Sequence, residues 1–99
     1  SESYYYAAVC VLDGKKAFLN PRGNIDKALE YIEAAIMIEP RGIYYYFMAY
    51  IKYDYFARKS YMTSPDYREC LNNAVSVGVP EADIQMLYAT LNVSRPDCM

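Results

Sequence analysis

Residues 24–40 read NIDKALEYIEAAIMIEP, and the spacing of their apolar side chains predicts an amphipathic helix. The apolar positions recur at i, i+3, i+4 and i+7, which places them on one helix face. They are Ile25, Ala28, Leu29, Ile32, Ala35 and Ile36. Asn24 is a suitable N-cap, and Pro40 disfavours a helical conformation at Glu39. We therefore expect a helix between these two points, with Ala35 buried at a close helix contact.

The chain repeats its pattern with a period of forty residues. The triplets Tyr4–Tyr6 and Tyr44–Tyr46 align, and each unit then passes a break with proline, restarts at an acidic residue and stops at proline. The end of the second unit reads SPDYRECLNNAVSVGVP (64–80), with Ser64 as the expected N-cap and Gly78 as a left-handed stop. Fixed periods of roughly 20 to 50 residues indicate stacked structural repeats.

We predict an all-α fold of about five helices, arranged as antiparallel hairpins within a single domain over residues 1–95. The first repeat covers about 2–40, the second about 42–80 and a closing helix about 81–93, followed by a tail at 94–99. Breaks are expected near residues 20–24, 39–42, 60–64 and 78–81, and two longer helices at Glu2 to about Leu19 and Ile43 to about Lys59. The second of these is aromatic on nearly every face, so more than one side should be covered.

Composition argues against several classes of protein. Ten basic and twelve acidic residues give a net charge of −2, which disfavours nucleic acid as a partner. No apolar run is long enough to span a bilayer, so no membrane partner is expected. Cys10, Cys70 and Cys98 are widely spaced and histidine is absent, which suggests neither a disulfide framework nor a metal site. We expect a cytoplasmic protein without a cofactor.

No residue pattern predicts catalysis. The four glycines lie at breaks and helix ends and form no phosphate-binding loop. Asp26, Glu30 and Glu33 lie one turn apart on a helix face, which is typical of a solvated charge pattern and not of an acid–base pair. The serines have no histidine to activate them. We therefore expect no enzyme activity and no small-molecule substrate.

The segment at residues 23–40 resembles the second helix of a tetratricopeptide repeat. That family places a small residue, a large one four positions later, a small one three beyond and a proline five further, which Ala28, Ile32, Ala35 and Pro40 match. Tyr6 and Tyr46, near the starts of the first helices, also suit the family. The family's usual small residue is replaced by Cys10 and Tyr50, and each unit is six residues too long. The chain thus resembles a degenerate, elongated tetratricopeptide array, which implies a right-handed superhelix.

The resemblance implies a concave surface, made by the first helix of each unit, that binds an extended peptide or a helix. Its positions in this chain are Tyr4, Ala7, Val11, Tyr44, Phe47, Ile51, Ile84 and Leu87. We accordingly expect a non-catalytic protein–protein interaction or scaffold module with an apolar aromatic binding face. An alternative is an oligomerisation or assembly segment of a larger repeat protein, without a separate ligand. In a further alternative these residues pack only against one another or against missing repeats. The expected partner is a protein or peptide, including a second copy of the chain.

Overall fold

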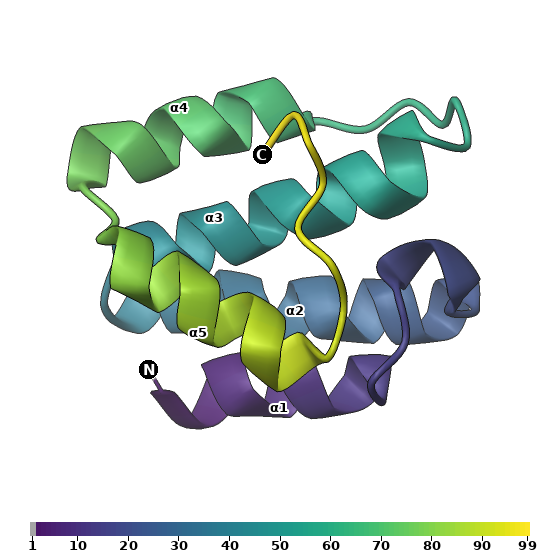
Figure 1. Ribbon diagram of the computed structural model, residues 1–99, viewed down its shortest axis with the longest axis horizontal. Coiled ribbons are helices and arrows are strands. Elements are labelled where there is room, and N and C mark those ends of the chain that lie inside the picture. The colour runs from purple at the N-terminus through teal and green to yellow at the C-terminus, as the bar shows by residue number, and fades with distance from the viewer. Residues whose placement is uncertain (1) are drawn as a thin grey trace.

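Two antiparallel helix pairs form most of the molecule, and a fifth helix lies across them (Figure 1). The computed structural model describes residues 2–99, which contain helices and connecting segments and no strand. The elements are α1 (Glu2–Leu12), the short 3₁₀ turn η1 (Ala17–Leu19), α2 (Arg22–Ile38), α3 (Gly42–Ile51), the π-helix η2 (Lys52–Ala57), α4 (Tyr67–Val77) and α5 (Glu81–Leu91). The prediction of an all-α fold with five α-helices is confirmed.

The packing order follows the chain. Helix α1 packs along α2, α3 packs along α4, and α2 joins the pairs by packing on α3. Helix α5 contacts both α3 and α1, and residues 92–99 then return across α3 towards α4 (Figure 1). At the end of this return the Tyr46 hydroxyl donates to the Met99 carbonyl oxygen at 3.1 Å.

Helix α3 is the centre of the hydrophobic core. Nine of its ten residues are buried, with Tyr45 as the half-buried exception. The expectation that this aromatic helix is covered on more than one side is therefore confirmed. Ala35 of α2 is also buried, as predicted. Gly42 begins α3 directly against the backbone of Gly78, and a Cβ atom at residue 42 would overlap the Gly78 carbonyl oxygen.

The first helix is shorter than predicted, because the chain turns at Asp13 and Gly14. Both residues have positive φ angles, +56° and +70°, which end α1 at Leu12 and not near Leu19. The buried Asn20 amide then donates to the Leu12 carbonyl oxygen at 3.2 Å and to that of Lys16 at 3.0 Å. The Leu12 and Lys16 carbonyl oxygens also accept from the backbone amides of Lys15 and Leu19, so Asn20 adds a second hydrogen bond to each and fixes the turn after α1.

Two expected N-caps are wrong. Helix α2 begins at Arg22 after Pro21, so Asn24 lies inside the helix and donates to the Asn20 side chain instead. Helix α4 is capped by Asp66 and not by Ser64, because the Asp66 carboxylate accepts from the Glu69 amide at 3.0 Å. The expected stop at Gly78 is confirmed, with φ at +97°.

The helix ends after α3 also differ from the prediction. The expected helix Ile43–Lys59 is present but changes from α to π geometry at Lys52. The closing helix ends at Leu91, where Asn92 adopts a left-handed conformation, and not at Val93. Across residues 2–99, no helix combines the length and apolar character needed to cross a membrane.

Candidate functional site

The predicted aromatic binding face lies mostly inside the core. Tyr44, Phe47 and Ile51 on α3 are fully buried, and so is Leu87 on α5. Ile84 is buried as well, Ala7 and Val11 are half-buried, and Tyr4 is the one exposed member of the set. The expectation that one side of α3 stays open to a partner is therefore wrong.

The predicted binding face is buried because of the position of α5. Its Tyr88 ring meets the rings of Tyr46 and Tyr50 edge-on, with centroids 6.0 Å and 5.7 Å apart. From α1, the Tyr5 ring lies 5.3 Å from that of Tyr44 and 5.7 Å from that of Phe47. Helices α1 and α5 also contact each other, so together they close over the side of α3 where a groove was expected.

A small hollow remains near the starts of α1, α3 and α5. Its volume is about 110 Å³, and Tyr5, Ile43 and Tyr44 contribute to its lining. Two exposed apolar side chains line it as well: Tyr6 is 53% exposed and Met86 is 66% exposed. The hollow therefore collects aromatic and apolar surface from three separate helices.

Charged groups complete the lining of this hollow. Arg41 pairs with Glu2 at 3.5 Å, and its guanidinium carbon lies 5.5 Å from the centre of the Tyr44 ring. Asp83 also lines the hollow and forms no ion pair with residues 2–99. Burial raises the pKa of Tyr5, and the Asp83 charge adds to this increase. The lining thus holds two carboxylates and one guanidinium.

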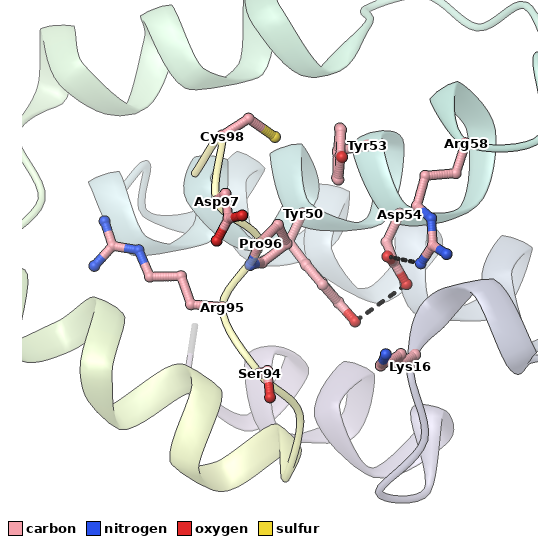
Figure 2. Close-up of a pocket in the computed structure, with 10 residues that line it drawn as sticks. All are labelled: Lys16, Tyr50, Tyr53, Asp54, Arg58, Ser94, Arg95, Pro96, Asp97 and Cys98. Atoms are coloured by element: carbon pink, nitrogen blue, oxygen red, sulfur yellow. Dashed lines mark hydrogen bonds and ion pairs between the residues drawn. The ribbon is translucent and has the colours of Figure 1, made fainter.

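A larger, polar cleft of about 400 Å³ lies between the C-terminal segment and the end of α3 (Figure 2). Tyr50, Asp54 and Arg58 form one wall, and Arg95, Asp97 and Cys98 form the other. Arg95 is held in place because it pairs with Glu81 at 2.8 Å and donates to the Met99 carbonyl oxygen at 2.7 Å.

Asp54 is the best-connected polar residue of the cleft, although it is only 3% exposed. Its Oδ1 accepts from Arg58 at 2.8 Å, and its Oδ2 accepts from the Phe18 amide at 2.8 Å and from the Tyr50 hydroxyl at 3.4 Å. The Tyr50 hydroxyl in turn accepts from the Ala17 amide at 3.2 Å. Burial raises the pKa of Tyr50, so its hydroxyl stays protonated and can donate to Asp54. These hydrogen bonds hold η1 against η2, so the role of the network is structural.

A thiol, that of Cys98, also lines the cleft. The thiol of Cys98 is free and exposed. The Cys98 side chain neighbours Tyr53 and raises the pKa of the Tyr53 hydroxyl. Within residues 2–99, no cluster of three histidine, cysteine or carboxylate side chains could hold a metal ion.

The π-helix was not foreseen, and it carries the two buried charges of the chain's described part, Lys52 and Asp54. Single-turn π segments are rare and often mark functional sites. The sequence signal was present in YIKYDYF (50–56), where two opposite charges interrupt an apolar run. Residues two apart do not share a helix face, so the two side chains reach different cavities.

No protein-family model, curated protein or solved structure gives a significant match to this chain.

Proposed function

We propose that this chain is a non-catalytic protein-interaction module that binds a partner peptide at the hollow near the starts of α1, α3 and α5. One observation carries the proposal: Tyr6 and Met86, from helices at opposite ends of the sequence, are exposed yet line the same hollow. Large apolar and aromatic side chains gathered at one concave point are typical of interface hot spots.

The charges of the lining define the partner. Among residues 2–99, Asp83 forms no ion pair, whereas Arg41 is already paired with Glu2. We infer a peptide that presents an apolar side chain to Tyr6 and Met86 and a basic residue to Asp83. The hollow takes about one side chain because its volume, about 110 Å³, is well below the roughly 300 Å³ of small drug-sized sites. The three cysteines are free, which supports a reducing compartment such as the cytoplasm.

The test compares two exposed methionines. Peptides are first selected by display on the immobilised protein, and their affinities are then measured for Met86→Glu and Met37→Glu. Met37 lies on α2, is 87% exposed and does not line the hollow, so it is the matched control. We expect Met86→Glu to weaken binding at least tenfold, or about 1.4 kcal/mol, and Met37→Glu to leave it unchanged. Equal affinity for both variants, with helicity retained, would exclude the hollow.

A second candidate is an assembly segment that uses its apolar surface to join other copies or other parts of a larger protein. Exposed apolar residues at the C-terminal ends of α2 and α4 favour it: Met37, Ile38, Val75 and Val77. Sedimentation velocity separates the two candidates, because self-association should then depend on Met37 and Val75 and not on Met86.

A further inference from the structure

Lys52, at the first position of η2, is a buried cation with few partners. The residue is 5% exposed, and its Nζ donates to the Thr63 hydroxyl at 2.6 Å. An ammonium group has three donors, so this bond leaves two unused. Across residues 2–99, no carboxylate lies within ion-pair distance of it. Lysine is almost never buried without such a partner.

A separate cavity of about 200 Å³ adjoins this ammonium. Tyr61, Thr63 and Tyr67 line it together with Lys52, and Arg68 supplies a second cation. The Arg68 guanidinium carbon lies 4.9 Å from the centre of the Tyr67 ring, and the Tyr67 ring is edge-on to that of Tyr53 at 5.1 Å. The cavity therefore has aromatic walls and two positive charges.

The neighbouring acidic groups do not neutralise Lys52. Asp66 lines the cavity, and its carboxylate accepts from the Glu69 amide at 3.0 Å as the N-cap of α4, so it sets one negative charge against the two positive charges of Lys52 and Arg68. Cys70 is buried, and burial raises the pKa of its thiol to about 11 even though the charge of Lys52 lowers it. The thiol is therefore neutral at pH 7, and the cavity keeps an excess of positive charge.

We propose that this cavity binds a small oxyanion, the carboxylate or phosphate group of a small molecule, through Lys52 and Thr63. Charged acceptors form stronger hydrogen bonds with ammonium donors than neutral ones do, and the two unused N–H groups require acceptors. The volume lies below the roughly 300 Å³ of drug-sized sites, so the ligand is a small acid or an inorganic anion. Tyr61 and Tyr67 would flank the remainder of an organic acid. The site is independent of the peptide hollow, with which it shares no residue.

The proposal is tested by NMR titration of the labelled protein with sodium phosphate, sodium acetate and sodium benzoate, against sodium chloride at equal ionic strength. We expect saturable shifts of the Thr63, Tyr67 and Arg68 amide signals with at least one of the three anions. Lys52→Met should weaken this binding at least tenfold, because a charge-assisted bond is lost. Lys27→Met removes the same charge from α2, outside the cavity, and should bind as the parent does.

Comparison of the anions separates carboxylate from phosphate recognition. The second variant, Arg68→Gln, alters an exposed residue and serves as the test if Lys52→Met does not fold. It should bind the anion more weakly than the parent does. The proposal is overturned if none of the three anions gives saturable shifts at these amides. Unchanged affinity in Lys52→Met, or in Arg68→Gln where only that variant folds, overturns it equally.

Discussion

The two buried charges of the π-helix, Lys52 and Asp54, lie in opposite situations. Asp54 accepts hydrogen bonds from the Phe18 amide, the Tyr50 hydroxyl and the Arg58 guanidinium, so both of its oxygens are used. Lys52 donates one hydrogen bond, to Thr63, and faces an open cavity. Both residues are equally hidden from solvent, at 3% and 5% exposure. Burial alone therefore does not distinguish a charge that supports the fold from one that is available to a ligand.

The number of satisfied hydrogen-bonding groups does distinguish them. A buried charge whose partners come from its own chain belongs to the fold, and removing it leaves those partners unpaired. A buried charge with unused donors weakens the fold unless something outside the chain completes it. The same six-residue helix should thus respond in opposite directions to mutation at its two charged positions.

Removal of Asp54 should have the largest effect. Asp54→Ala leaves the Phe18 amide, the Tyr50 hydroxyl and the Arg58 guanidinium without their acceptor, so we expect a loss of about 3 kcal/mol in the free energy of unfolding. Urea denaturation followed by circular dichroism measures it.

The control is Asp97→Ala, because Asp97 is exposed and lines the same cleft. It should change the free energy of unfolding by about 0.5 kcal/mol or less. If the two alanine variants are equally stable, the Asp54 network contributes nothing to the fold and the comparison fails.

The second-largest effect should be a loss of folding stability at alkaline pH, which arises at the buried Cys70 thiol near Lys52. Burial raises the pKa of the Cys70 thiol from 9.0 to about 11. Between these pH values the folded state therefore keeps a proton that the unfolded chain has lost. The unfolded state binds fewer protons between these values, so stability falls as pH rises from about 9 to 11 and is unaffected by this group below 9. The loss should be about 2 kcal/mol.

Urea midpoints at pH 8, 9, 10 and 11 measure this decline. Buried tyrosines such as Tyr5 and Tyr88 have raised pKa values and add to it, so the informative quantity is the difference between parent and Cys70→Ala. That variant should lose less stability over this range than the parent, whereas Cys10→Ala, at an exposed thiol, should follow the parent. Parallel curves for parent and Cys70→Ala would mean that the thiol is not desolvated.

Local patterns predicted α2 well, because a single amphipathic face determines where it lies. The apolar stripe of α2 and the stop at Gly78 depend on neighbouring residues alone, and both were predictable. The end of α1 was missed because Asp13 and Gly14 interrupt a run that regains apolar residues at Ala17. The Asp13–Gly14 pair is itself a turn signal, so this helix end was readable from the sequence, and the hydrogen bond from Asn20 to the Leu12 carbonyl agrees with it.

The candidate sites were much less predictable, since they depend on where α5 lies. Phe47 and Ile51 are apolar whether they face a partner or the core, and only the contact of α5 with α3 and α1 decides between the two. Lys52 and Asp54 were visible as interruptions of an apolar run, but charges are exposed by default. Their burial follows from tertiary packing and from the change to π geometry.

Replacement of Lys52 should have the smallest effect on stability, and of the opposite sign to Asp54→Ala. Lys52→Met removes a desolvated ammonium and places a thioether of similar length beside Phe56, whose ring centre lies 5.1 Å from the Lys52 nitrogen. The variant loses the hydrogen bond from Lys52 to the Thr63 hydroxyl. Because Thr63 is half-buried, water can take the place of this donor. We therefore expect the free energy of unfolding to stay the same or to rise by about 1 kcal/mol.

Lys59→Met is the matched control. The Lys59 ammonium lies 4.3 Å from the Phe18 ring centre on a half-buried residue, so its removal should cost about 0.5 kcal/mol. A loss of more than about 1 kcal/mol in Lys52→Met would place Lys52 in the same structural role as Asp54. A gain in stability combined with lost anion binding would instead be the signature of a charge that the fold keeps for a ligand.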